Sequence, residues 1–460
     1  MTARATEAGT TPVLLWLRQD LRLADQPALI AAAAQGAVIP VYVLDDDAAG
    51  DWRIGGAQRW WLHHSLASLD AALRTIGSRL ILRRGHVVDV LRGLVEETGA
   101  TRIHAIRHYE PWWRDAEAAL DDVLCLHDGN HLAPPEQVKT GSGAPFRVYS
   151  SFWKALQAQM PPPKPEPAPE TLTAPKHWPA SDTLKDWGLL PKRDWADGFA
   201  DEWTPGEEAA HHAATAFADQ VEEYETRRNL PSLDGTSRLS PHLHHGEISA
   251  RAVWHAVDGH AHADKFRSEL AWRDFTDGVV TALPDYAWIN GRPRYDAMRW
   301  RTGSDADADR KAWEQGRTGY PIVDAGMRQL WTMGWIHNRV RMICASFSVK
   351  HLLLDWRVGE RWYWDCLVDA DYGNNSVNWQ WIAGTGVDAN MFGRIMAPLG
   401  QSEKFDAADY IRRWVPELKD LGDDVIHDPD AAGVRPDAYP AKIIGHREAR
   451  ERALAANRAI

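Results

Sequence analysis

Residues 318–394 place polar side chains inside an apolar, helical pattern. Met327, Leu330 and Met333 recur every three residues, as one face of a helix requires. The same stretch holds side chains that a core does not accept without partners, because burying a lone polar group costs free energy. These are the side chains of Asn338, Arg339, Arg341, Asp369, Asp371, Asn374 and Asn375. We therefore expect them to face a polar ligand or water.

Tryptophans accompany these polar residues. They stand at positions 331, 335, 356, 362, 364, 379 and 381. Hydrogen-bonding groups can bind the edge of a ring system while indoles pack on its faces. For each tryptophan alone, core packing is the commoner explanation. The combination indicates a pocket for a large, flat and polar aromatic molecule.

A hydroxyl-rich loop within residues 224–249 offers a place for an anion. It consists of Asp234, Gly235, Thr236, Ser237 and Ser240. Pro241 then fits the first turn of a helix, for which Ser240 is the candidate N-cap. Hydroxyls leading into a helix N-terminus suit a pyrophosphate. An ordinary capped helix explains the same spacing and is the commoner case.

The motif ELAWRDF places Glu269 and Trp272 three residues apart, on one face of a predicted helix. A carboxylate can bind the edge of a base while an indole stacks on its face. The alternative is an exposed glutamate beside a core tryptophan, which is more frequent.

The motif WIHNRVRM places Asn338 and Met342 on one helical face, with Arg341 near them and Arg339 turned away. Two arginines can serve two anionic partners, such as a carboxylate and a phosphate. The alternative is a solvated helix with surface arginines.

The pattern of apolar runs divides the chain into three regions. Residues 12–130 alternate short apolar runs with helical periods, which predicts a parallel α/β sheet with helices on both faces. No GxGxxG follows the first run, so the dinucleotide fingerprint is missing. Residues 131–205 include a proline-rich segment, 160–170, and are predicted to be an extended interdomain connector. Residues 206–460 show helical periods only and are predicted to be all-α.

The composition is ordinary except for 24 tryptophans in 460 residues. A net charge of −12 gives no global footprint for nucleic acid, which leaves a local basic groove open. Three separated cysteines argue against zinc, disulfide and iron–sulfur frameworks, so we expect no metal and a reduced, cytoplasmic setting. The N-terminus lacks the apolar core of a secretory signal, and no run is long enough to span a membrane.

Several motifs together resemble the photolyase/cryptochrome flavoprotein family. They are LLWLRQDLRL, DGTSRLSP, ELAWRDF, TGYPIVDAGMRQL, GWIHNRVRM, NWQW and EKFDAADYIRRWVPEL, and they extend over nearly the whole chain. The resemblance is greatest to microbial class I photolyases that act on cyclobutane pyrimidine dimers (CPDs). It implies an α/β + all-α fold: a Rossmann-like parallel antenna domain, a long connector and a helical FAD-binding domain.

The resemblance implies a folded FAD inside the helical domain. Its phosphate region should contact Tyr224, Thr236, Ser237, Leu239 and Ser240. The other expected contacts are Arg273, Trp335, Arg341, Asp369, Asp371 and Asn375. Asn375 matches the family position that faces flavin N5, where plant cryptochromes carry aspartate. A neutral amide there favours the fully reduced, anionic flavin.

The resemblance also implies light-driven repair, in which excited reduced FAD gives an electron to a flipped-out dimer and recovers it after the ring splits. The matching substrate residues are Glu269, Trp272, Asn338, Met342 and Trp381. Glu269 should bond the dimer bases and the two tryptophans should stack on them. Photolyases for 6–4 photoproducts carry histidine at the asparagine position, so that substrate is disfavoured. The expected DNA contacts are Arg228, Arg339, Arg394 and Lys404.

Trp379, Trp356 and Trp300 match the family's electron-transfer chain, from the flavin to the surface. An antenna chromophore, methenyltetrahydrofolate or 8-hydroxydeazaflavin, is expected near His108–Trp113 and the Asp45–Asp47 turn. We expect a monomer that acts on UV-damaged DNA, without a membrane or an obligate protein partner.

Two other functions compete with repair. A cryptochrome-like blue-light photoreceptor would use the same FAD and tryptophans, but the sequence has no long tail after its last motif. A catalytically silent flavin-binding module is disfavoured by the complete set of substrate residues.

Overall fold

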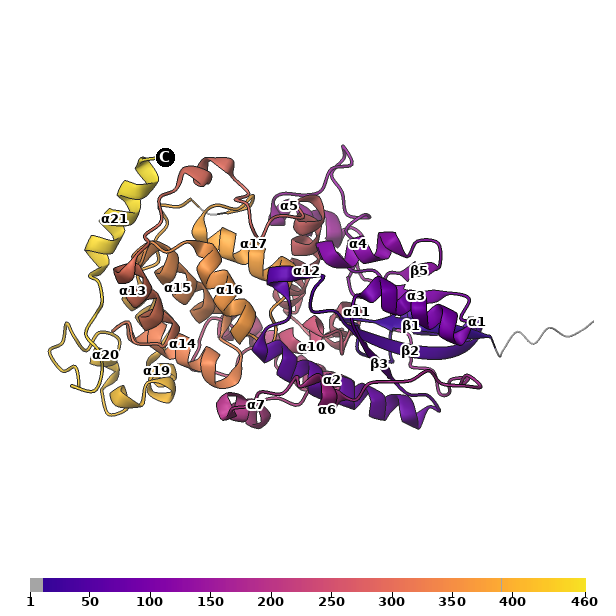
Figure 1. Cartoon of the computed structure of the whole chain (residues 1–460). Coiled ribbons are helices and arrows are strands. Elements are labelled where there is room, and N and C mark those ends of the chain that lie inside the picture. Colours follow the sequence, from indigo (N-terminus) through magenta and orange to yellow (C-terminus); the bar gives the residue numbers. More distant parts are fainter. Residues whose placement is uncertain (1–10, 390) are drawn as a thin grey trace, which may run out of the picture.

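The computed structural model describes residues 11–389 and 391–460 (Figure 1). Its N-terminal part contains one five-stranded sheet with the order β3-β2-β1-β4-β5. The strands are β1 (Pro12–Leu17), β2 (Ala37–Leu44), β3 (Ile81–Arg84), β4 (Ile103–Ile106) and β5 (Leu124–His127). All neighbouring strands are parallel, so helices connect them across the faces of the sheet.

Side chains of β1 alternate between two apolar cores, because successive strand residues point to opposite faces. Val13, Leu15 and Leu17 pack with α1 (Pro27–Gln35) and α2 (Gly56–Thr75). Leu14 and Trp16 pack on the other face with α3 (Val87–Thr98) and α4 (Pro111–Ala119). Helices therefore cover both faces, as the sequence predicts.

The connector region 131–205 contains α5 (Tyr149–Gln157), α6 (Leu184–Trp187), η2 (Asp194–Ala196) and α7 (Asp197–Glu202). Its proline-rich segment, 160–170, has neither helix nor strand. The chain here follows the α/β domain: Asp25 N donates to Glu166 O at 2.7 Å, and Val38 N donates to Thr173 O at 3.1 Å. The exact limits of the three regions stay predictions.

The described part of the chain after β5 contains no strand and forms a helical body, seen on the left of Figure 1. Its longer helices are α8 (Glu207–Ala218), α12 (Asp264–Ala282), α13 (Ser304–Glu314), α14 (Pro321–Met333), α15 (Asn338–Ser346), α16 (Trp356–Cys366), α17 (Tyr372–Ala383) and α21 (His446–Arg458). Shorter helices are α9 (Tyr224–Arg227), α10 (Ser240–His244), α11 (Ala250–Ala256), α18 (Pro398–Lys404), α19 (Ala408–Trp414) and α20 (Asp423–Ile426). Single turns are η1 (Gly50–Trp52), η3 (Val221–Glu223), η4 (Pro293–Ala297), the π turn η5 (Phe347–His351) and η6 (Pro416–Leu418). The predicted fold class is confirmed.

A buried polar joint connects the sheet to the helical body. Asp25, which is 1% exposed, accepts hydrogen bonds from Ser249 Oγ at 2.5 Å and from Arg251 Nη2 at 2.6 Å. Arg22 donates to the carbonyls of Gly129 and Gly246. Buried charges are stable only when they are paired and hydrogen-bonded, so this joint fixes how the two parts meet.

No helix within residues 11–389 and 391–460 has both the length and the apolar character that crossing a membrane requires.

Replacing Asp25 by Asn should lower the free energy of unfolding by about 3 kcal/mol, because Arg251 would keep its buried charge without a partner. Asparagine also tolerates the positive φ of 51° found at this position, so the backbone is not a confounding cause. Urea unfolding measures the change. The control is Arg447→Ala, because Arg447 is 94% exposed in its ion pair with Glu451. Equal urea midpoints for the two variants would contradict the role of the joint.

Candidate functional site

Helix α17 lies at the centre of the site and packs against α12, α15 and α16. Asp371 caps it, accepting from Asn374 N at 2.7 Å. Asn375 and Trp379 follow at four-residue steps, which places the three side chains along one face. Asn375 Nδ2 donates to Glu360 O at 3.0 Å, and its Oδ1 accepts no hydrogen bond from the residues that the structure describes. The structure thus brings together three of the residues predicted around the flavin.

Arg341 and Asp369 form an ion pair at 3.2 Å beside α17. Asp369 is 8% exposed. Arg341 Nε is buried and has no hydrogen-bond partner among the described residues, so it remains available to a polar ligand.

Asp371 also contacts two side chains from other helices. His244 Nδ1 of α10 lies 3.7 Å from its Oδ2, and Arg273 Nη2 of α12 lies 3.6 Å from the same atom. Burial raises the pKa of the Asp371 carboxyl, but His244 and Arg273 outweigh this effect and hold the pKa well below its ordinary value. Asp371 is therefore a carboxylate at neutral pH.

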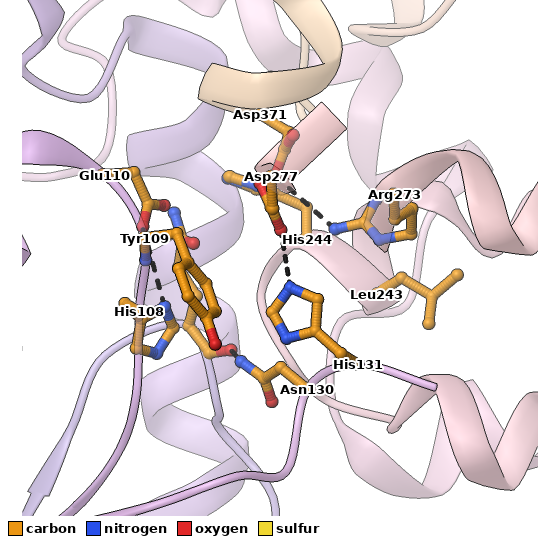
Figure 2. A pocket seen from close by; sticks show the side chains of 11 residues that line it. His108, Tyr109, Glu110, Asn130, His131, Leu243, His244, Arg273, Asp277 and Asp371 are labelled. Carbon is orange, nitrogen blue, oxygen red and sulfur yellow. Dashed lines mark hydrogen bonds and ion pairs between the residues drawn. The ribbon is translucent and has the colours of Figure 1, made fainter. Parts of the chain in front are cut away.

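A polar cavity of about 30 Å³ separates Asp371 from the α/β domain (Figure 2). The cavity is lined by residues from both parts of the molecule. The α/β domain and the start of the connector contribute Gln19, His108, Tyr109, Glu110, Asn130 and His131. The helical body contributes Leu243, His244, Arg273, Asp277 and Asp371. His131 Nε2 bonds Asp277 Oδ2 at 2.7 Å. A volume of this size holds about one water molecule. An antenna chromophore at His108–Glu110 would need a different side-chain arrangement, and its position stays a prediction.

Two groups at this cavity bind protons more tightly than usual. Burial, together with the carboxylates of Asp277 and Asp371, raises the pKa of Glu110 to about 8. Burial lowers the pKa of His131, but the hydrogen bond to Asp277 and the charge of Asp274 raise it to about 9 overall. At neutral pH, Glu110 is therefore protonated and His131 is a cation paired with Asp277.

The predicted substrate residues of α12 have partners that the sequence did not indicate. Glu269 pairs with Arg228, and it also pairs with Lys265 at 2.7 Å. Burial raises the pKa of Glu269, but these two cations hold it below its ordinary value. Trp272 stacks on Tyr149 of α5 with ring centroids 3.8 Å apart and an interplanar angle of 8°. Glu269 is therefore ionised, and Tyr149 covers one face of the Trp272 indole.

Helix α15 places Asn338 in its first turn, where the residue is exposed. His337 caps the helix, because its Nδ1 accepts from Arg339 N at 3.2 Å. The prediction that Arg339 turns away from Met342 is wrong: Arg339 Nη1 lies 3.9 Å from Met342 Sδ, and Nη2 donates to Asn229 at 2.5 Å. Sequence spacing ignores the length of an arginine side chain, which reaches across its own helix.

The prediction that Ser240 is the N-cap of α10 is also wrong. The helix begins at Ser240, and Leu239 occupies the cap position without a side-chain bond. Ser240 instead accepts from Trp335 Nε1 at 3.3 Å. That bond joins the hydroxyl loop, with Thr236 and Ser237, to the tryptophan predicted beside the flavin.

The three predicted electron-transfer tryptophans differ in burial. Trp379 is 3% exposed, Trp356 is fully buried and Trp300 is half-buried. Trp379 packs tightly on α16, because a Cβ on Gly359 would lie 2.2 Å from its ring. Trp356 begins the same helix and donates to Asn290 Oδ1 at 3.0 Å.

Not every predicted tryptophan surrounds the pocket. Trp331 is 50% exposed and stacks on Trp362 at 6.0 Å, on the outer side of α14 and α16. Trp364 packs on Trp52 at 5.2 Å, against the N-terminal region. Helical periodicity alone did not distinguish these faces, because α16 carries apolar residues on more than one side.

The predicted DNA contacts lie at different depths. Lys404 and Arg394 are exposed, whereas Arg228 and Arg339 are half-buried. Lys404 and Arg339 both lie over the Phe405 ring, at 5.3 and 4.5 Å. No group of three or more His, Cys, Asp or Glu residues in the described chain is arranged to hold a metal ion.

The residues around α17 fit FAD by the chemistry of their donors and acceptors. Among the described residues, Arg341 Nε and His244 Nδ1 are buried without hydrogen-bond partners. The carboxylates of Asp369 and Asp371 accept, and Ser237 and Ser240 carry hydroxyls. Phosphates, ribityl hydroxyls and the polar edge of isoalloxazine need this mixture. Sequence analysis did not single out Tyr149, Glu360 or His244. Tyr149 lies 123 positions from Trp272 in the chain, so no local spacing relates the two.

Raising the pH from 6.5 to 9 should lower the free energy of unfolding. Folded Glu110 keeps a proton that the unfolded chain releases near its ordinary pKa of 4.5, so each pH step up to about 8 favours unfolding. The raised pKa of His131 also makes the free energy of unfolding fall between pH 6.5 and pH 9. Urea midpoints against pH measure this, and Glu110→Gln should flatten the curve. The exposed Glu223→Gln is the control, and a Glu110→Gln curve that keeps the wild-type slope would contradict the assignment.

Comparisons with known proteins agree with this arrangement. Residues 13–170 match the family model described as DNA photolyase, and residues 266–459 match the one described as the FAD binding domain of DNA photolyase. A deoxyribodipyrimidine photo-lyase of Agrobacterium fabrum is 48% identical over 98% of this chain and 98% of its own. Cryptochrome-1 of Arabidopsis thaliana is 35% identical over 95% of this chain and 69% of its own.

The solved structure of a bacterial class III photolyase from Agrobacterium tumefaciens is also similar. It superposes with a TM-score of 0.93 at 46% identity, covering 100% of this chain and 99% of that one. The sequence-based assignment to class I stays a prediction, because this neighbour is of class III. Since family models match both parts of the molecule and relatives match nearly its whole length, this chain belongs to the photolyase/cryptochrome family.

Proposed function

We propose that this protein is an enzyme that repairs cyclobutane pyrimidine dimers in DNA with light. The observation that carries the proposal is the pairing on α12: an ionised Glu269 lies one turn from a Trp272 whose ring is held flat by Tyr149. A carboxylate accepts hydrogen bonds from the N–H groups of pyrimidines, and an indole stacks on a base face. This pair therefore suits a flipped-out pyrimidine dimer.

The other substrate residues complete the proposed pocket. Asn338 and Met342 would contact the dimer from α15, and Trp381 of α17 would stack against it opposite Trp272. Arg228 holds Glu269 ionised and places a positive charge where the dimer acquires negative charge. Arg339, Arg394 and Lys404 would contact phosphates at the pocket mouth.

FAD, when bound in its reduced form, supplies the electron that light sends to the dimer. We propose that Asn375, Asp369, Asp371, Arg341, Arg273 and Trp335 hold its ring and sugar. Tyr224, Thr236, Ser237, Leu239 and Ser240 would hold its phosphates. The ionised Asp371 lies 3.7 Å from His244 Nδ1 and 3.6 Å from Arg273 Nη2, so it helps to position both side chains in the proposed pocket. The Oδ1 atom of Asn375 can accept a hydrogen bond from the flavin, but it has no proton to donate.

Further details extend the proposal. Trp300, Trp356 and Trp379 would pass electrons inward from the surface. A monomer without an obligate partner, a cytoplasmic location and an antenna chromophore stay predictions from the sequence. A photoreceptor function like that of the cryptochromes remains the alternative.

Glu269→Gln should slow repair of a thymine-dimer oligonucleotide by about 10- to 100-fold, because a charge-assisted hydrogen bond contributes about 1.5–3 kcal/mol. Bound flavin, measured by absorbance, should not change. The control is Glu223→Gln, which neutralises an exposed glutamate in a similar arginine pair. Wild-type repair by Glu269→Gln would contradict the assigned pocket.

Trp379→Phe should block the photoreduction of oxidised flavin while leaving repair by previously reduced enzyme unchanged. Phenylalanine keeps the packing on Gly359 but is much harder to oxidise than tryptophan. Flavin absorbance under blue light, with a thiol reductant, measures the rate. Trp364→Phe is the matched control on the neighbouring helix. If Trp379→Phe and the control photoreduce at the same rate, Trp379 is not the first donor.

A further inference from the structure

Helix α12 places a lysine on the face that carries two predicted substrate residues. Lys265 lies four residues before Glu269, and Trp272 lies three residues after it, so the three side chains share one side of the helix. The side chain of Lys265 is 39% exposed and that of Glu269 is 25% exposed. Sequence analysis did not single out this lysine. It is a direct neighbour of the proposed dimer pocket.

Two cations from different elements contact the same oxygen of Glu269. Arg228, the C-cap of α9, brings its Nη1 to Oε1, and Lys265 brings its Nζ to within 2.7 Å of the same atom. A carboxylate has about four lone-pair sites, which are divided between its two oxygens. Because both of these ion pairs are made by Oε1, Oε2 can accept from the N–H group of a bound base.

Two contacts restrict the Glu269 carboxylate more than one contact does. The last torsion of a glutamate side chain is broad, because it joins an sp³ carbon to an sp² carbon. A contact with Arg228 alone would let the carboxylate turn about this bond. Lys265 resists that rotation, since it holds the same oxygen from the preceding turn of the helix. Restriction of this kind matters in a binding site, because a small misplacement of a contacting group weakens the interaction strongly.

The charged and titratable groups around Glu269 come from several elements. They are Lys265 of α12, Tyr224 and Arg228 of α9 and its C-cap, Arg339 of α15 and Tyr149 of α5. Burial raises the pKa of Glu269, whereas Arg228 and Lys265 lower it below its ordinary value. Removing Lys265 takes away one of these two cations, so the pKa of Glu269 should rise. Lys265 therefore widens the pH range in which Glu269 is ionised.

We propose that Lys265 is a positioning residue of the repair site: together with Arg228 it holds Oε1 of Glu269, which directs Oε2 toward the N–H groups of a flipped-out pyrimidine dimer. The lysine acts through Glu269 and does not itself contact the dimer. The inference rests on the proposed function, because it takes the dimer pocket at Glu269 and Trp272 as given. It assigns to Lys265 an effect on the discrimination between damaged and undamaged DNA.

The test measures DNA binding in the dark by full-length, FAD-loaded protein. The readout is the ratio of the affinities for a duplex with one thymine dimer and for the same duplex without damage. This ratio cancels the general loss of affinity that follows when a positive charge is removed. Lys265→Met keeps the length of the side chain without its charge and should lower the ratio about two- to fivefold near neutral pH. Lys265→Arg should restore the ratio.

The matched control is Lys311→Met, which removes an exposed lysine of α13. It should leave the ratio unchanged. Flavin absorbance checks that every variant carries the same amount of FAD.

A double-mutant cycle with Glu269→Gln separates a positioning role from a direct contact. An uncharged glutamine no longer forms the ion pair, so adding Lys265→Met to Glu269→Gln should not change the ratio further. If Lys265→Met lowers the ratio by the same factor in both backgrounds, the lysine acts on DNA directly and the inference is overturned.

The pH dependence of the same ratio is the second readout. Protonation of Glu269 removes its charge, so the ratio should fall as the pH is lowered. The fall should begin at a higher pH in Lys265→Met than in the wild-type protein, whereas Lys265→Arg and Lys311→Met should follow the wild type. A lysine that only stabilises the fold would not move this curve.

The outcomes separate this inference from the proposed function. Coincident pH curves for the wild type and Lys265→Met would overturn the role of Lys265, as would a wild-type ratio in Lys265→Met near neutral pH. Light-dependent repair by the wild-type protein is measured separately, and its absence would instead overturn the proposed function.

Discussion

The charge of Asp371 is the interaction on which the site depends. This carboxylate caps α17, so it fixes the start of the helix that carries Asn375 and Trp379. Its second oxygen faces His244 and Arg273, which belong to two other helices. Burial opposes the charge, and the contacts with His244 and Arg273 and the backbone N–H of Asn374 offset this effect. One ionised group thereby aligns three helices around the proposed cofactor pocket.

The α/β domain contributes to the same arrangement from the opposite side. Glu110 and His131 reach the cavity next to Asp371, and both hold protons that neutralise what would otherwise be a cluster of buried carboxylates. The hydrogen bonds of Asp25 to Ser249 and Arg251 hold the α/β domain against the helical body. The α/β domain therefore lines a cavity next to the proposed FAD pocket, although the predicted FAD contacts all belong to the helical domain.

Much of the fold could be predicted from the sequence because it follows from local periodicity. Apolar runs of strand length separated by helical periods predicted the parallel sheet, and the exclusively helical periods of residues 206–460 predicted the helical body. Within the site, residues on one helix were also predictable, as for Glu269 with Trp272. Contacts between distant segments were not. The stacking of Tyr149 on Trp272, the pairing of Arg228 with Glu269 and the interdomain cavity depend on packing, which no spacing encodes. The prediction for Arg339 was wrong because its long side chain reaches across its own helix. The prediction for Ser240 was wrong because α10 begins at this residue. Trp331 lies away from the pocket because it belongs to a second apolar face.

Light-dependent repair is the measurement that tests the central claim most directly. Purified, photoreduced protein is mixed with an oligonucleotide that carries one thymine dimer, and dimer loss is followed under blue light and in the dark. The proposed function predicts loss of the dimer in light only. Flavin that photoreduces normally while the dimer persists in light would contradict repair and favour a photoreceptor built on the same pocket.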